Sequence, residues 1–288
     1  MNQPLAGTEP LIDVHAHFFH ADAGRSDWAE VNAARLRAGE RIGITYHVAS
    51  VLGSYGFSSP TYFPSPGDVG TGNDAMLEIA ARERERVRMY VTVNPNYSGH
   101  AIGEIERCAD RGAIGVKLLA SRRADDSVLD PIAELAGARG LPLLHHIWQH
   151  RRREWPSQEI SDGADLARLA ARHPGTTFIL AHIGGGGDYA HTFAAVADVP
   201  NILADLSGSG VDRGMLDEAL ATLGPRRLLW ACDITMETGL AKLRALEVIG
   251  LGAEVLADIR WRNATRIFAE GAFPKARTAQ PALQPSLR

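Results

Sequence analysis

The chain has 288 residues, of which 45% are hydrophobic and 22% are charged, close to the averages of globular proteins. This composition excludes a disordered chain, and the net charge of −4 argues against a surface for nucleic acid or anionic membranes. Two cysteines, Cys108 and Cys232, are too few for a disulfide framework. The start shows no secretory signal, and no apolar run reaches the ~18 residues of a membrane span. We therefore expect a cytoplasmic protein whose partner is a small-molecule substrate, and a homodimer stays open.

Eight short apolar segments recur along the chain. Their β-branched or Leu-rich composition, bounded by Gly, Pro or polar turns, is typical of buried strands. They lie at residues 11–19, 44–52, 87–94, 114–120, 141–148, 177–183, 201–207 and 227–233.

The segments between these strands have the apolar spacing of helices, for example at residues 73–86, 99–111, 130–139, 162–173, 211–223 and 239–249. Strands that alternate with helices predict a parallel sheet. Eight such units in this length favour a closed (β/α)₈ TIM barrel, distorted, over an open doubly wound sheet. We expect one barrel domain over residues 1–273 and a loose Pro-, Ala- and Gln-rich tail over 274–288.

One connection, from Gly53 to Gly72 after the second strand, is unusually long. Long loops on the catalytic side of a barrel are often lids or binding loops. Its aromatic residues, Tyr55, Phe57, Tyr62 and Phe63, can form one wall of a pocket. The alternative is a loop that is held in place by its own aromatic side chains.

The first strand carries Asp13, His15 and His17 at alternate positions. The period of two residues in a strand places all three on one face. Two buried imidazoles are costly unless each has a ligand or a hydrogen-bond partner. The pair therefore indicates either a shared cation or two satisfied core histidines.

Later strands favour the cation. The fifth strand ends in His145 and His146, the sixth in His182, and the eighth in Asp233. In a parallel barrel the carboxyl ends of all strands meet at one rim. Imidazole nitrogen and carboxylate oxygen suit a divalent, zinc-like ion with one position open to water, so we predict a metal site at this rim.

Several motifs recur in a specific order and spacing. They are IDVHAHF at 12–18, GAIGVKL at 112–118, LPLLHH at 141–146, FILAHIGG at 178–185, LLWACD at 228–233 and NATRIF at 263–268. Together they resemble the metal-dependent amidohydrolase superfamily, specifically its amidohydrolase-2 (aminocarboxymuconate-semialdehyde-decarboxylase-like) branch. The resemblance covers about residues 11–268 and implies a (β/α)₈ barrel that usually holds one divalent ion.

The resemblance also implies a set of metal ligands on the first, fifth and eighth strands, namely His15, His17, His146 and Asp233. On the fifth strand the family places its ligand four residues after a proline, and counting from Pro142 gives His146. His145 points to the opposite face of the strand and is the alternative ligand. We expect one zinc ion, with manganese as the alternative.

Two further residues have predicted roles. By resemblance, His182 is a catalytic group that acts on the substrate or the bound water, and Asp233 also accepts the proton of that water. Lys117 lies in the middle of the fourth strand, where an ionised lysine is costly unless it is paired. We expect Lys117 to bind substrate; the alternatives are a carboxylated lysine in a binuclear site, a pair with Asp233, or an aliphatic stem whose head reaches the rim.

The predicted function is that of a metal-dependent hydrolase acting on a small acid, ester, lactone or amide through a metal-activated water. The alternative uses the same metal for non-oxidative decarboxylation of an unsaturated or aromatic carboxylic acid. A third interpretation, from a different class, is a metal-free binding barrel that kept the fold. The metal content of protein purified without chelator distinguishes this third case from the other two.

Overall fold

The computed structural model of the chain describes residues 9–22, 26–51, 62–147, 158–183, 189–208, 213–234 and 236–277. Within these ranges eight strands lie side by side in chain order, and each pairs in parallel with the next. They are β1 (Ile12–Phe18), β2 (Tyr46–Val51), β3 (Val87–Val93), β4 (Ala113–Leu118), β5 (Leu143–His145), β6 (Phe178–Leu180), β7 (Ile202–Asp205) and β8 (Leu228–Leu229).

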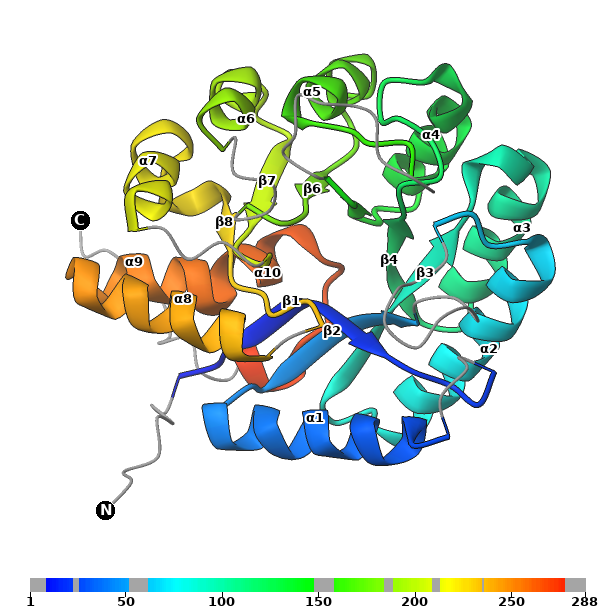
Figure 1. Cartoon of the computed structure of the whole chain (residues 1–288), viewed down its shortest axis with the longest axis horizontal. Coiled ribbons are helices and arrows are strands. Elements are labelled where there is room, and N and C mark those ends of the chain that lie inside the picture. Colours follow the sequence, from blue (N-terminus) through cyan, green and yellow to red (C-terminus); the bar gives the residue numbers. More distant parts are fainter. Residues whose placement is uncertain are drawn as a thin grey trace, which may run out of the picture.

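Helices surround the strands, as Figure 1 shows. Eight of them follow the strands in turn: α1 (Trp28–Ile42), α2 (Pro66–Arg82), α3 (Ser98–Ala109), α4 (Asp130–Ala138), α5 (Gly163–Arg172), α6 (Tyr189–Val196), α7 (Arg213–Leu223) and α8 (Met236–Ile249). Short 3₁₀ turns lie at Pro95–Tyr97, Ser127–Leu129 and Pro225–Arg227, and the chain closes with α9 (Ala253–Ala257), a π-helical turn (Asp258–Arg262), α10 (Asn263–Ile267) and α11 (Pro274–Arg277). This arrangement confirms the predicted (β/α)₈ barrel.

Helix α2 begins earlier than the sequence analysis predicted. The Ser65 hydroxyl accepts the Asp68 N–H, the Asp68 carboxylate accepts the Ser65 N–H, and Pro66 occupies the first turn. This capping box starts the helix at Pro66, so the prediction of a loop as far as residue 72 was wrong. Residues 53–61 of that predicted loop lie outside the described residues.

Two layers of apolar side chains hold the barrel together. One layer faces the barrel axis and takes side chains from every strand: Ile12, Val14, Tyr46, Val48, Tyr90, Ile114, Leu144, Ile179, Leu203 and Leu229, with Ala181 and Ala231 just beyond β6 and β8. The other layer lies between strands and helices and includes Phe18, Val91 and Leu143. This alternation fixes which strand residues point into the barrel.

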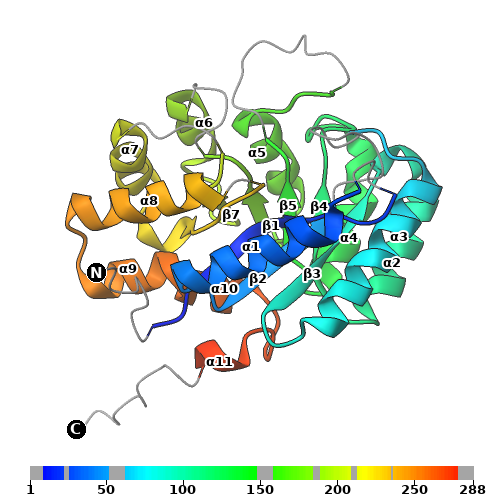
Figure 2. The ribbon, with the colours of Figure 1, turned by 60° about the horizontal axis from the view of Figure 1, so that its bottom comes forward.

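The C-terminal segment closes one end of the barrel. The ring of Phe268 packs 6.0 Å from that of Tyr90, and the ring of Phe273 packs 5.3 Å from that of Tyr46, measured between centroids. Figure 2 shows α10 and α11 at this lower end. Helix α11 lies within the first residues of the predicted tail and carries the buried Ala276; residues 278–288 lie outside the described part, so the domain boundary stays a prediction. Among the described helices, none has both the length and the apolar character needed to cross a membrane.

We expect Asn263→Ala to lower the free energy of unfolding by about 2 kcal/mol, measured by urea denaturation. The fully buried Asn263 amide donates to the carbonyls of Pro225 and Leu228, both at 2.7 Å, and thereby ties α10 to the start of β8. Thr265→Ala on the same helix is the control, because within the described part of the chain its hydroxyl bonds only the nearby Arg262 carbonyl. Equal losses in both variants would contradict this role for Asn263.

Candidate metal centre

Three side chains bring their donor atoms together at the carboxyl ends of β1 and β8. His15 Nε2 lies 3.1 Å from His17 Nε2, which in turn lies 3.1 Å from Asp233 Oδ1. The remaining pair, His15 Nε2 and Asp233 Oδ1, is 3.7 Å apart. A four-coordinate ion with ligands at about 2.0–2.1 Å has neighbouring ligand atoms roughly 3.3 Å apart. The three donors therefore fit one divalent ion.

A bulge in β1 aims both histidines into the barrel. The register against β2 shifts between Asp13 and Ala16, which breaks the period of two residues. Asp13 faces the outer layer instead, where its Oδ2 accepts hydrogen bonds from Arg35 and His47, each at 3.0 Å. The prediction that Asp13 shares a face with the two histidines was therefore wrong.

Hydrogen bonds to the outer ring nitrogens orient both imidazoles. His15 Nδ1 donates to Asp205 Oδ2 at 2.8 Å, and His17 Nδ1 lies 3.0 Å from Ser50 Oγ and 3.3 Å from the Ser50 carbonyl. These partners leave Nε2 of each ring as the atom that faces the cluster. Asp205 was not among the predicted site residues, although it lies near the end of the predicted seventh strand, and the other site residues also lie at strand ends.

Asp233 and His182 both have left-handed backbones, with φ of +62° and +64°. This conformation costs non-glycine residues about 1–3 kcal/mol and is most common at functional sites. Hydrogen bonds hold it in place: the Asp233 N–H donates to the His15 carbonyl at 2.7 Å, and the His182 N–H donates to Asp205 Oδ1 at 3.0 Å. Asp205 thus contacts both His182 and His15, and Asp233 is bonded to His15 through its main chain.

His182 lies beside the cluster. Its Nδ1 is 3.1 Å from Ser207 Oγ and 3.5 Å from Asp233 Oδ2, and its Nε2 is 2.9 Å from His146 Nδ1. An imidazole in this place can exchange a proton with Asp233.

The two histidines of the fifth strand lie on opposite faces. Leu144 faces the barrel axis, so alternation turns His145 towards the helices and His146 towards the axis. Among the described residues, His146 is not part of the three-residue donor cluster, although it contacts His182. Its place as a metal ligand therefore stays a prediction.

Lys117 projects from β4 into the barrel and is almost completely buried. Its ammonium group donates to His15 Nε2 at 2.7 Å. Burial lowers the pKa of Lys117 to about 8, against the opposing effect of the carboxylates of Asp233 and Asp205. Lys117 therefore reaches the donor cluster itself, and its predicted role in substrate binding stays a prediction.

Burial sets the protonation states of the cluster. It lowers the pKa of His17 to about 3 and that of His182 to about 4, so both rings are neutral near pH 7. Burial raises the pKa of Asp233, but the neighbouring imidazoles of His182, His17 and His15 more than offset this and hold it well below its usual range. Neutral imidazoles and an ionised carboxylate are the forms that bind a metal ion.

The end of the long connection after β2 reaches the site. The Tyr62 ring lies 5.4 Å from the His146 ring between centroids, and burial together with the charge of Asp233 raises the pKa of its phenol. The Ser121 hydroxyl donates to the Tyr62 carbonyl, and the Asn94 amide donates to the Pro64 carbonyl at 2.9 Å. Residues at the ends of β3 and β4 thus hold Tyr62 at the rim beside His146; its place in one wall of a substrate pocket stays a prediction.

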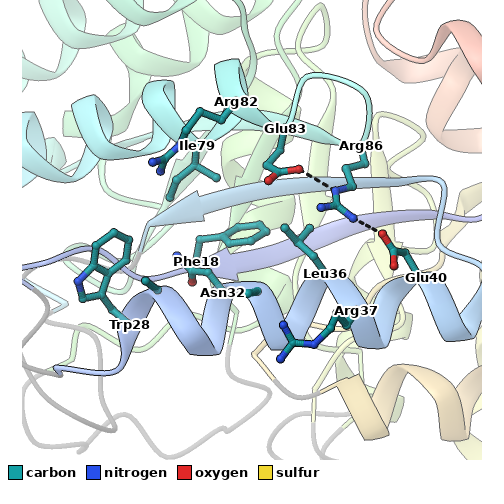
Figure 3. Close-up of a pocket in the computed structure, with 12 residues that line it drawn as sticks. Phe18, Trp28, Asn32, Leu36, Arg37, Glu40, Ile79, Arg82, Glu83 and Arg86 are labelled. Atoms are coloured by element: carbon teal, nitrogen blue, oxygen red, sulfur yellow. Dashed lines mark hydrogen bonds and ion pairs between the residues drawn. The ribbon is translucent and has the colours of Figure 1, made fainter.

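A cavity of about 390 Å³ lies away from this cluster, between α1 and α2 (Figure 3). Phe18, Leu36 and Ile79 line it, and Arg86 forms ion pairs with Glu83 and Glu40 at its edge. None of the clustered donors borders it. The cavity therefore lies apart from the candidate metal centre.

Comparison with known proteins agrees with this geometry. A model of the amidohydrolase family matches residues 12–269. The chain belongs to this family. The match confirms the family that the motifs predicted. As a member of this family, the protein is an enzyme. No curated protein sequence shows significant similarity to the chain.

Solved structures share the amidohydrolase fold at low sequence identity. A 2,6-dihydroxybenzoate decarboxylase from Rhizobium is 16% identical, with a TM-score of 0.68 over 90% of this chain and 98% of that one. A dihydroxybenzoic acid decarboxylase from Polaromonas sp., with manganese and 2-nitroresorcinol, is 18% identical (TM-score 0.67; 90% and 96% covered). A 5-carboxyvanillate decarboxylase from Novosphingobium aromaticivorans, with manganese and 4-hydroxy-3-methoxy-5-nitrobenzoic acid, is 15% identical (TM-score 0.70; 92% and 99% covered).

We expect the double variant His15→Ala/His17→Ala to lose its bound divalent ion, because two of the three clustered donors are removed. Elemental analysis of protein purified without chelator measures this. His146→Ala should weaken binding, whereas His145→Asn is the matched control, because His145 faces the helices. Full metal retention by the double variant, or loss in the control alone, would contradict the assignment.

Tyr62→Ala should raise KM by about 2- to 10-fold, the range expected for the loss of one aromatic contact. Steady-state kinetics measures this, and the melting temperature should change little because Tyr62 is only half-buried. Phe63→Ala is the control, because 44% of the neighbouring Phe63 is exposed. Unchanged KM in Tyr62→Ala would show that the phenol ring does not contact substrate.

Proposed function

We propose that this amidohydrolase is a metal-dependent decarboxylase of a small aromatic or unsaturated carboxylic acid, with one divalent ion as cofactor. The observation that carries the proposal is the buried ammonium group of Lys117, which lies against the donor cluster. A cation beside a metal ion favours an anionic substrate. The solved structures support the same chemistry, because they include decarboxylases of hydroxylated benzoic acids, two of them with manganese.

The residues that would hold the ion are His15, His17 and Asp233, with His146 as the proposed fourth ligand. When bound, the ion supplies a Lewis acid that polarises an oxygen of the substrate. Imidazole and carboxylate donors suit both zinc and manganese. The manganese in the neighbouring structures makes Mn²⁺ the first ion to test.

The ammonium group of Lys117 needs a new partner when a metal ion is bound. Its ammonium group and a metal ion compete for the same His15 lone pair, so the ammonium group must turn away when that nitrogen binds a metal. A carboxylate is the natural new partner, because a buried cation is costly unless it is paired. We assign Lys117 to the carboxylate of the substrate.

His182 and Asp233 handle the proton. In decarboxylation the bond between the substrate carbon and its carboxylate breaks, the electron pair stays on that carbon, and CO₂ leaves. The carbon must then take up one proton. His182 Nδ1 lies 3.5 Å from Asp233 Oδ2, so a proton that the site takes up from water can pass between the two groups before it reaches the carbon.

Hydrolysis of a small ester, lactone or amide is the second candidate. One specific observation favours it: Asp233 directs Oδ1 towards the cluster and Oδ2 towards His182. A carboxylate arranged in this way can accept the proton of an attacking water with Oδ2. The two candidates use the same residues and differ in the atom that receives the proton.

Isotope labelling separates the two reactions. The Mn²⁺-loaded protein is incubated in D₂O with 2,6-dihydroxybenzoate and 5-carboxyvanillate, and in H₂¹⁸O with a panel of small esters and lactones. We expect CO₂ release and one deuterium on the product carbon. Incorporation of ¹⁸O without CO₂ release would replace decarboxylation by hydrolysis, and inactivity on both panels would count against both.

His182→Asn should lower kcat by ~10²–10⁴ while metal content stays near that of the wild type, because His182 moves the proton. Single-turnover kinetics and elemental analysis measure the two quantities. Ser207→Ala is a control that keeps the His182 ring and removes only the hydroxyl that contacts His182, His15 and Asp205. If His182→Asn strips the ion, His182 is a ligand and the proton role belongs to Asp233 alone.

A further inference from the structure

The barrel has a seam between its first and last strands. Ladder pairing runs from β1 to β8, but among the described residues the last strand is tied back to β1 only by one isolated bridge, between Ala16 and Asp233 in the segment that follows β8. Two main-chain hydrogen bonds cross the seam, from Val14 N–H to the Trp230 carbonyl at 3.2 Å and from Asp233 N–H to the His15 carbonyl. The clustered metal donors lie on both sides of this seam.

The Asp13 carboxylate supplies the contacts that a regular ladder would provide. Its Oδ1 accepts the Cys232 N–H from across the seam at 2.9 Å and the His15 N–H at 3.3 Å. Asp13 is completely buried, so these contacts form away from water. One side chain thus contacts the backbone on both sides, next to both groups of donors.

Helix α1, on the outer side of the strands, contacts the Asp13 carboxylate through Arg35. Arg35 Nη2 donates to Asp13 Oδ2 at 3.0 Å, and Arg35 Nη1 donates to the Ile234 carbonyl at 3.1 Å. One planar guanidinium group therefore reaches the aspartate of β1 and the residue that follows the left-handed Asp233. Gly39 allows the helix to lie this close, because a Cβ there would approach His47 Nε2 to 2.6 Å.

Three consecutive residues around Asp233 are fixed in this way. The Cys232 N–H bonds Asp13, the Asp233 N–H bonds His15, and the Ile234 carbonyl bonds Arg35. We propose that Arg35 and Asp13 are positioning residues, which together hold Asp233 at a fixed separation from His15 across the seam. The inference rests on the metal site of the proposed function, and the pair acts on the ion only through these ligands.

The test measures metal affinity and ligand geometry separately from catalysis. Arg35→Met, Arg35→Lys, Asp13→Asn and the Arg35→Met/Asp13→Asn double variant are titrated with Mn²⁺, and their Co²⁺-loaded forms are examined by visible absorption. We expect 10- to 100-fold weaker Mn²⁺ binding in each single variant, the usual range for residues that orient ligands. The double variant should lose less than the product of the two single effects, because the pair works as a unit.

Arg227→Met is the matched control. Arg227 also donates to main-chain carbonyls, those of Val196, Ala197 and Val199, but it precedes β8 at the opposite end of that strand. Its replacement should lower the melting temperature and leave the Mn²⁺ affinity and the Co²⁺ band unchanged. A shifted Co²⁺ band in the Arg35 and Asp13 variants then reports altered ligand geometry, which a general loss of stability does not produce.

Folded Arg35→Lys and Asp13→Asn variants with wild-type Mn²⁺ affinity and an unchanged Co²⁺ band would overturn the inference. A measurement on the unmodified chain covers the case in which the variants do not fold. Adding Mn²⁺ should slow hydrogen exchange at the Cys232 and Asp233 amides, because the ion joins both sides of the seam; unchanged exchange there would also overturn it. If the wild type binds no divalent ion, the proposed function itself fails.

Discussion

The hydrogen bond from the Asp233 N–H to the His15 carbonyl, 2.7 Å long, joins the last strand of the barrel to the first. It forms where regular strand pairing is missing. It brings Asp233 next to His15 and His17, which are more than 200 residues away in the chain, so that the three side chains form one donor cluster. The left-handed backbone of Asp233 is part of the same arrangement, because it turns the carboxylate towards the two histidines. The geometry of the site therefore depends on how this barrel closes.

Buried carboxylates lie next to cationic or imidazole groups in two places near the junction of the first and last strands. Inside the barrel, Asp205 and Asp233 face the ammonium group of Lys117 and a group of neutral imidazoles. Behind the barrel wall, Asp13 faces the guanidinium group of Arg35 and the ring of His47. A buried carboxylate is tolerated only when it is paired and hydrogen-bonded, and each of these aspartates meets that condition through groups that also orient the site.

The site draws its residues from two kinds of element. His15 and His17 lie on β1 and Asp205 on β7, and Asp233 follows β8 and is held by a main-chain hydrogen bond to β1. Tyr62, in contrast, comes from a connection between β2 and α2, which the ends of β3 and β4 hold in place. Barrel enzymes commonly separate function in this way, with chemistry at strand ends and specificity in the loops.

The sequence alone predicted the eight strands, the barrel and the family, because buried parallel strands leave short apolar runs and the polar residues follow those runs directly. It also placed His15, His17, His182 and Asp233 at one rim. It could not locate Asp13 or Asp205: the bulge in β1 reverses the face of Asp13, and the partners of Asp205 lie 23 and 190 residues away in the chain. Side-chain direction and long-range pairing depend on strand register and closure, so only the tertiary structure decided which polar residues hold the site and which hold the barrel around it.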